Sequence, residues 1–387
     1  MSAPNVQQIL VNETNRISEE MYRRKMHKPG WSQVVINSWW KKGMGDEVSA
    51  MVYERSLPSE EPTWTPVRLN TGSGNTCVPD AVTISPAQTL RAYGLDRTAV
   101  KSDLICVDDA RATFALMQQI ESVVANLAEQ VDYIWENRKR DEYVRLAEHK
   151  VIFNDAFAEG SAAFPLTVPQ YGPSQKPLDW VYQRLSRDFG MEGASGVDNT
   201  APVYIAFMSM EASDIIVRDD PNNRQDFRES DRNNELLRAM GINRVYRGFA
   251  HAIDNFCPRY NFVDGAWVRV QPYISVAATQ GNKSILNPAY FTAEFEDIIV
   301  FNTKVYQCEY PEPVTSIPGG GSFNQGPETY RGTYVWRNEY DDIRNPDQTY
   351  GFWRGVLTQA SRPITPEAGY VIRVRRCDPQ GRMVFCS

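Results

Sequence analysis

The feature that most constrains this chain is a long stretch without glycine or proline. It extends from Leu95 to Glu159, and its central part, Asp108 to Lys150, has the pattern of a helix. Apolar residues recur there every three or four positions, which places them on one face of a helix. Two aspartates, Asp108 and Asp109, stand where they can cap the first free N–H groups. An unbroken helix over 108–150 would be about 65 Å long, which exceeds the diameter of a compact domain and predicts an extended or many-copy protein. The apolar stripe comprises Phe114, Met117, Ile120, Val124, Leu127, Val131 and Ile134.

The end of this predicted helix carries opposite charges three or four residues apart, a pattern that stabilises helix surfaces. The same pattern would also fit a helix in the core of a domain or one arm of a helical hairpin, so these stay open as alternatives to a single extended rod. A bend in the helix is expected near Trp135–Lys139. A strict coiled coil is disfavoured because Asn126, Asn137 and residues 138–140 interrupt the heptad. The expected pairs are Glu136 with Arg140, Arg138 with Glu142, and Asp141 with Arg145.

Composition restricts the class of protein. The chain has 387 residues, of which 42% are hydrophobic and 23% charged, as in a globular protein of one elaborate domain or two. The 41 basic and 48 acidic residues give a net charge of −7, which argues against a dedicated nucleic-acid binder. No apolar run approaches the ~20 residues of a membrane span, and no secretory signal is visible at the N-terminus.

Cysteine and histidine give no metal-binding pattern. The 6 cysteines form no C-x-x-C pair, and the 3 histidines would have to converge from distant positions to bind zinc. We therefore expect no metal site and no cofactor. We also expect reduced thiols in a protein made in the cytoplasm, with a Cys377–Cys386 disulfide as a minor alternative.

Catalytic motifs are absent from the sequence. There is no G-x-S-x-G elbow, no phosphate-binding P-loop and no H-E-x-x-H. The carboxylate-rich run 219–235 fails as a calcium loop because Arg224 and Gln225 occupy its ligand and turn positions. His251 stands three residues before Asp254, a spacing that could suit a general base and the carboxylate that orients it. No candidate nucleophile lies beside it in the sequence, so a structural histidine is favoured. We expect no enzyme and no catalytic residue.

Residues 36–107 carry strand patterns at Val48–Val52 and Leu90–Tyr93 on either side of a proline-rich excursion. Because an isolated hairpin is marginal in water, we expect a projecting β loop that rests on another surface. Its tip is expected to touch a neighbouring subunit. The N-terminal arm is expected either to be solvated or to lie on an acidic surface or phosphate. The residues expected to contact other subunits are Glu60, Glu61 and Trp64 in the loop, and Arg23 and Arg24 in the arm.

The rest of the chain alternates helix and strand patterns, which indicates an α+β fold. Helices are expected at Leu178–Leu185 and Ser213–Arg218, and a hairpin turn at Asp264–Gly265. The longest strand-like run is Tyr290–Tyr306. Further strands are expected at residues 34–40, 151–153, 202–208, 244–253, 260–263, 267–270, 333–337, 355–360 and 370–376.

Several linear blocks, in the right order, carry a resemblance to a known family. They are Gln88–Tyr93 leading to Ser102–Asp109, then Arg244–Asn255, Pro258–Phe262, Val268–Tyr273, and Asn287–Tyr290 before Thr303–Tyr306. Over most of its length the chain resembles the major capsid protein of a tailed bacteriophage, whose fold is shared with encapsulins and the herpesvirus capsid floor. None of these blocks is a catalytic signature.

The resemblance implies an α+β tailed-phage capsid fold with five parts. They are an N-terminal arm (1–35), an extended β loop (36–107), a spine helix and the start of a peripheral domain (108–164), an axial domain (165–280), and peripheral return strands with a C-terminal β region (281–387).

The resemblance also implies self-assembly into an icosahedral shell around packaged double-stranded DNA. Many copies would form hexamers and pentamers in the virion capsid after synthesis in the host cytoplasm. The partners it implies are a separate scaffold protein, a portal, decoration proteins and non-specifically contacted DNA, with no membrane. An encapsulin-like nanocompartment shell is the alternative within the fold, and a soluble hydrolase is the alternative from another class.

Overall fold

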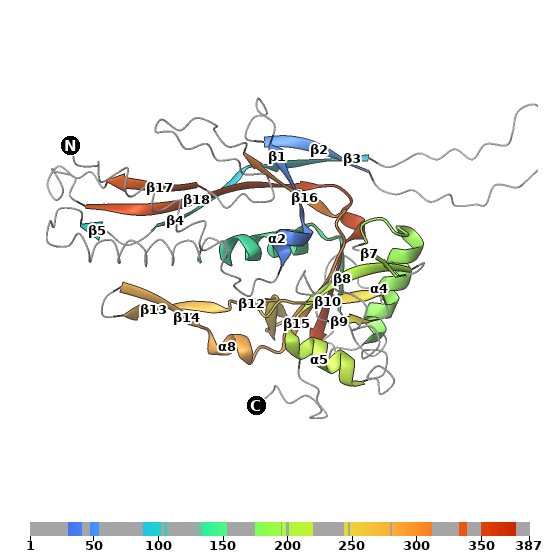
Figure 1. The fold of residues 1–387 in the computed structure, drawn as a ribbon. Coiled ribbons are helices and arrows are strands. Elements are labelled where there is room, and N and C mark those ends of the chain that lie inside the picture. Colours follow the sequence, from blue (N-terminus) through green and yellow to red (C-terminus); the bar gives the residue numbers. More distant parts are fainter. Residues whose placement is uncertain are drawn as a thin grey trace, which may run out of the picture.

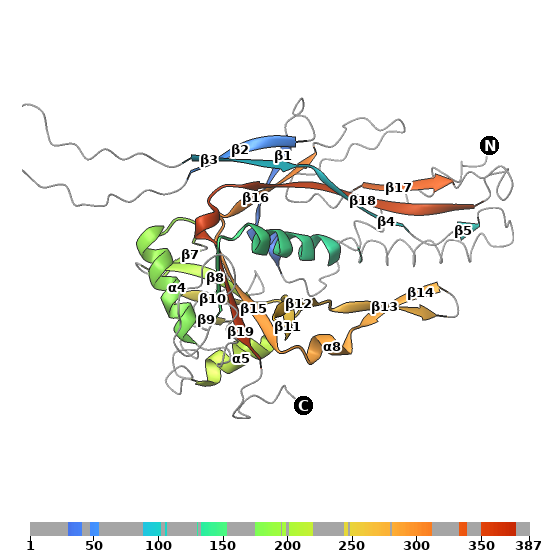
Figure 2. The same ribbon diagram turned by 180° about the vertical axis from the view of Figure 1, so that it is seen from behind.

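The computed structural model (Figure 1) describes residues 30–40, 47–53, 88–101, 105–106, 130, 133–152, 175–194, 196–198, 201–219, 244–246, 248–278, 281–311, 333–338 and 350–376. These residues build two large sheets, two separate hairpins and a helix over residues 133–146. Figure 2 shows the same arrangement from behind, with this helix between the two sheets.

The nine-stranded sheet forms the centre of the body. β8 is parallel to β10 and antiparallel to β15, which in turn pairs with β19. Every residue of β15 is buried, as expected for a central strand covered on both faces. The sheet runs β12 (Ala266–Val270), β11 (Arg259–Val263), β15 (Phe295–Phe301), β8 (Ala201–Met208), β10 (Phe249–Ile253) and β9 (Arg244–Tyr246), with β19 (Tyr370–Arg375), β6 (His149–Ile152) and β7 (Gly196–Asp198) joined alongside.

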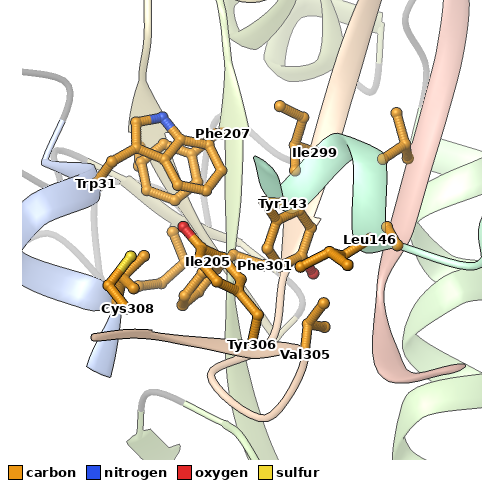
Figure 3. Packing of buried hydrophobic residues seen from close by; sticks show 14 of the residues in the cluster. Trp31, Tyr143, Leu146, Ile205, Phe207, Ile299, Phe301, Val305, Tyr306 and Cys308 are labelled. Carbon is orange, nitrogen blue, oxygen red and sulfur yellow. The ribbon is translucent and has the colours of Figure 1, made fainter. Parts of the chain in front are cut away.

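Alternate residues of the central strands point into two hydrophobic cores, because side chains alternate across a strand. On one face, Phe207 packs with Trp31 of α2 (Trp31–Val34) and with Tyr143 of the helix 133–146 (Figure 3). On the other face, Tyr204 and its neighbours pack against α4 (Gln175–Asp188) and α5 (Met210–Asp219). The helical residues of the second core include Leu178, Val181, Leu185, Ala212 and Ile216.

The six-stranded sheet is organised by one long strand, β18 (Tyr350–Pro363). The two sheets are joined directly by residues 302–305, and the Tyr143 hydroxyl donates to the Val300 carbonyl at 2.6 Å beside this junction. The Tyr306 hydroxyl donates to the Lys139 carbonyl at 2.8 Å, which ties the helix to the six-stranded sheet as well. The strands paired with β18 are β4 (Asp96–Lys101), β5 (Ile105–Cys106), β16 (Tyr306–Pro311) and β17 (Thr333–Asn338), and β1 (Ile36–Trp40) runs parallel to β16.

Two hairpins pair only with themselves in the described part of the chain: β2 (Glu47–Tyr53) with β3 (Gln88–Gly94), and β13 (Tyr273–Ala278) with β14 (Gly281–Leu286). A short helix, α8 (Pro288–Phe291), follows β14. In Figure 1 the two hairpins extend from the body in opposite directions.

The predicted helix 108–150 is wrong at its end. The helix stops at residue 146, and His149–Ile152 form β6, parallel to β19. The backbone N–H groups of Glu148 and His149 donate to the carbonyls of Pro366 and Gly369. Pairing with a segment far along the chain therefore overrides the local helix pattern. Residues 108–129 lie outside the described part, so the length of the rod stays a prediction.

The predicted charge pairs on this helix are also replaced by tertiary contacts. Arg138 lies 2.7 Å from Asp96 of β4, and Arg140 lies 3.4 Å from buried Asp254. Glu136 accepts from the backbone N–H of Ser32 in α2 at 3.2 Å. Arg145, by contrast, keeps a partner within the helix, because it pairs with Glu142 at 2.7 Å rather than with the predicted Asp141. Glu136, Arg138 and Arg140 thus hold the helix to the rest of the fold.

Three strand predictions need correction. The run Tyr290–Tyr306 is not one strand, because α8, β15 and β16 occupy it and the two strands belong to different sheets. The run 244–253 is the β9–β10 hairpin, which turns at Gly248 with φ +82°. The strand predicted at 34–40 starts at Ile36, after the helical turn Trp31–Val34.

The expected β loop 36–107 is only partly a projection. Its outer parts β1, β4 and β5 pair with β16 and β18 of the chain's own six-stranded sheet. Only the β2–β3 ribbon within it pairs with itself alone in the described part. The domain boundaries themselves stay predictions.

Candidate assembly surfaces

The His251–Asp254 pair is built into the core. Both residues are 0% exposed. His251 Nδ1 lies 3.0 Å from Ser213 Oγ, whereas Asp254 accepts from Trp31 at 3.0 Å and from the Phe256 N–H at 2.9 Å. These hydrogen-bond partners give both side chains a structural role, which is the interpretation that the sequence favoured for His251.

The two cysteines whose side chains are described, Cys257 and Cys308, are free and buried. Burial raises the pKa of both thiols above the usual value. A buried, protonated thiol is a poor nucleophile and metal ligand. Among the described residues no group of three or more His, Cys, Asp or Glu could hold a metal ion, and no described helix is long and apolar enough to span a membrane.

The N-terminal segment enters the body through Trp31. Its indole stacks on Phe207 with ring centroids 4.0 Å apart and donates to Asp254 (Figure 3). Arg140, 2% exposed, lies beside the same carboxylate and also donates to the Phe256 carbonyl. Burial lowers the pKa of Arg140, but the carboxylates of Asp254 and Asp141 more than offset this and raise it overall. The arm is therefore joined to the body at a charged, buried anchor.

The β2–β3 ribbon has one covered face and one open face. Ala50 and Val52 are 5% and 1% exposed, whereas Met51 and Leu90, which lie directly opposite each other, are 55% and 69% exposed. The Tyr93 hydroxyl donates to Glu309 at 3.2 Å, and Arg91 lies 3.4 Å from Glu148. The ribbon is thus held on the body by one face and presents an apolar pair on the other.

The predicted contact residues Glu60, Glu61, Trp64, Arg23 and Arg24 lie outside the described residues. The structure does locate the ends of the loop that holds the first three. Tyr53 and Gln88 form the last pair of the β2–β3 ribbon, so residues 54–87 leave and re-enter it at one point. That placement is compatible with the predicted contact at Trp64, which stays a proposal.

Sequence reasoning missed the β13–β14 hairpin. Four of its apolar side chains are exposed by 38% to 48%. Ile274 and Val276 alternate with Ser275, a period-two pattern that marks a strand, and Gly281–Asn282 marks a turn nearby. The exposed residues are Ile274, Val276, Ile285 and Leu286.

A buried ionic cluster fixes the chain where it leaves this hairpin. Arg376 lies 2.6 Å from Glu211, and its other nitrogen donates to the Phe291 and Ala293 carbonyls at 2.9 Å. Arg259 lies 3.0 Å from Glu211 and donates to the Tyr290 carbonyl at 3.0 Å. α8 is therefore locked to β11, α5 and the end of β19.

Comparison with known proteins identifies this architecture. No protein-family model matches the chain, and no curated protein matches it. Among solved structures it is similar to the capsid asymmetric unit of cyanophage Pam1, with a TM-score of 0.50, 7% sequence identity and 88% of each chain covered. The chain has the fold of a phage capsid protein. The predicted α+β phage capsid fold is therefore confirmed.

Other structures align with this capsid fold along most of the chain. The SrpI encapsulin of Synechococcus elongatus gives a TM-score of 0.44 at 9% identity, with 90% of this chain and 88% of that chain covered. The capsid of Ralstonia phage GP4 gives 0.42 at 11% identity, with 87% and 85% covered.

Proposed function

We propose that the chain is the major capsid protein of a tailed phage. Copies of it would assemble as hexamers and pentamers into an icosahedral shell around double-stranded DNA. The observation that carries this proposal is the capsid fold, aligned over 88% of this chain and 88% of the Pam1 capsid chain. A purely structural role is also in keeping with the buried settings of His251 and Asp254.

The surface supports assembly of many copies. The β2–β3 and β13–β14 ribbons leave the body in opposite directions (Figure 1), and each exposes apolar side chains. Different surfaces at opposite ends of a subunit favour heterologous contacts, which close into rings and shells. Several weak contacts per subunit then add up to a stable particle.

The net charge of −7 suits a container for DNA. A strongly basic protein would neutralise many phosphates and bind the packaged genome tightly. Non-specific contact with DNA, a separate scaffold protein, a portal and decoration proteins belong to the proposal. So do synthesis in the host cytoplasm and a final location in the virion.

Negative-stain electron microscopy and light scattering of the purified protein test the proposal. We expect closed shells tens of nanometres across, which the multivalent contacts would form. A protein that stays monomeric over a wide concentration range, both alone and together with its scaffold protein, would contradict it.

The alternative, an encapsulin-like compartment, is distinguished by the contents of particles from the native source. Double-stranded DNA protected from nuclease, together with portal protein, is expected for a phage head. An enzyme held inside particles that lack DNA would favour the compartment instead.

A further inference from the structure

The β13–β14 hairpin carries an apolar face made by a cross-strand pair. Ile274 and Ile285 lie directly opposite each other and are 39% and 38% exposed. Val276, two residues along β13 on the same face, is 39% exposed. Opposed β-branched side chains on one face of a ribbon contact each other and stabilise the strand pairing, so they form one continuous apolar surface.

This face is turned away from the body. Tyr273 points to the other face of the ribbon and contacts Tyr133 of the helix 133–146 and Phe256, with ring centroids 5.1 Å and 5.7 Å apart. Neighbouring strand residues point to opposite faces, so the Ile274–Ile285 face looks away from that helix. Partial burial raises the pKa of Tyr133 to about 12.

The base of the hairpin is held rigidly. The Asn287 N–H donates to the Pro272 carbonyl at 2.9 Å, and Asn287 Nδ2 donates to the Gln271 carbonyl at 2.8 Å, closing the two strands together. The Tyr290 hydroxyl donates to the Cys257 carbonyl at 2.6 Å, next to the ionic cluster of Arg259 and Arg376. A rigid support lowers the entropic cost of binding by the surface it carries.

We propose that the Ile274–Ile285 face docks on a second copy of this chain inside the assembled shell. The proposal rests on the proposed function. Three half-exposed aliphatic side chains offer on the order of 200 Å², against roughly 800 Å² per partner in a stable pair of proteins. The face is thus too small to hold a free dimer. It suits a subunit that makes several contacts at once with identical neighbours.

The test compares Ile285→Asp with the control Val263→Asp. Val263 is 49% exposed at the end of β11, so the control introduces the same charge at another exposed strand position. Both variants should keep the wild-type circular dichroism spectrum and melting temperature. Ile285→Asp should lower the yield of closed shells at least tenfold, while the control stays within twofold of wild type. Equal yields from Ile285→Asp and wild type would overturn this interface and leave the proposed function standing.

Hydrogen exchange of wild-type protein gives a second reading in case Ile285→Asp fails to fold. The amides of residues 274–285 should exchange at least tenfold more slowly in assembled particles than in dissociated subunits. Equal exchange rates in both states would overturn the interface. They would mean that the face is open in the particle or that the subunit's own chain already covers it before assembly. If wild-type protein forms no shells, both the proposed function and this interface fail.

Discussion

Trp31 and Asp254, 223 positions apart in sequence, are joined by a 3.0 Å hydrogen bond from the indole to the carboxylate. Arg140 of the helix 133–146 lies 3.4 Å from the same carboxylate, and all three side chains are buried. One contact therefore connects the start of the described chain, the helix and the end of β10.

Replacing Trp31 should destabilise the subunit in two separable ways. Trp31→Ala removes the ring that stacks on Phe207 and should lower the free energy of unfolding by about 3–5 kcal/mol. Trp31→Phe keeps most of the packing but leaves the Asp254 carboxylate without one donor, at a cost of about 1–3 kcal/mol. Urea unfolding of dissociated subunits measures both. A Trp31→Phe variant as stable as wild type would contradict a role for the hydrogen bond, and equal losses in the two variants would contradict a role for the stacking on Phe207.

Gly248 should tolerate no side chain, because its φ is +82° and a Cβ there would lie 2.1 Å from the Tyr182 ring. Gly265 is a matched control: its φ is +80°, but a Cβ would meet nothing within 4 Å. Gly265→Ala should cost only the backbone strain of about 1–2 kcal/mol, measured by thermal unfolding. Gly248→Ala should cost more than twice as much. Similar losses would mean that Tyr182 moves aside freely.

The buried Glu296 carboxyl should give a measurable pH dependence of stability. Burial raises its pKa above the usual value near 4.5, although Arg259 and Arg376 partly oppose the shift. A raised pKa in the folded state means that the stability linked to this proton is fully present below the unfolded pKa. It is lost as pH rises through the folded pKa. The free energy of unfolding of wild type, minus that of Glu296→Gln, should therefore fall as the pH rises from about 4 through the raised pKa of Glu296.

Chemical denaturation across this pH range provides the measurement. Glu294→Gln, an exposed position two residues earlier, is the control and should follow the wild-type curve. If the difference in unfolding free energy between wild type and Glu296→Gln grew with pH, the two arginines rather than burial would determine the pKa of Glu296.

Trp64→Ala should reduce the yield of intact shells several-fold while the subunit keeps its melting temperature, because the proposed contact lies between subunits. Trp64→Phe, which keeps an aromatic surface, should retain most of the yield. Electron microscopy counts the particles, and calorimetry checks the fold. Normal particle yields from Trp64→Ala would remove Trp64 from the proposed interface.

Elements with strong local patterns could be predicted from the sequence. Leu178, Val181 and Leu185 recur at helical spacing and are all buried in α4. The turn at Asp264–Gly265 has positive φ at both residues, as its sequence predicts. These features depend on neighbours a few residues away, which is why periodicity and turn chemistry suffice.

Boundaries set by distant partners could not be predicted in this way. The helix 133–146 ends where β6 begins to pair with β19, more than 200 residues further along. The break between β15 and β16 lies at Asn302, whose side chain accepts from the Lys304 N–H at 2.9 Å. Gly193 packs so closely on Asn302 that a Cβ would clash with it. The polar residues Asn302, Thr303 and Lys304 can be read from the sequence, but they do not show that the strands on either side of them join different sheets.

The four-residue junction between β15 and β16 has a mechanical consequence. The Tyr143 hydroxyl of the helix 133–146 donates to the Val300 carbonyl before the junction, and the Tyr306 hydroxyl after the junction donates to the Lys139 carbonyl of the same helix at 2.8 Å. Tilting one sheet against the other would break both bonds inside a closed core. A shell made of such subunits would therefore change its curvature by reorienting whole building blocks.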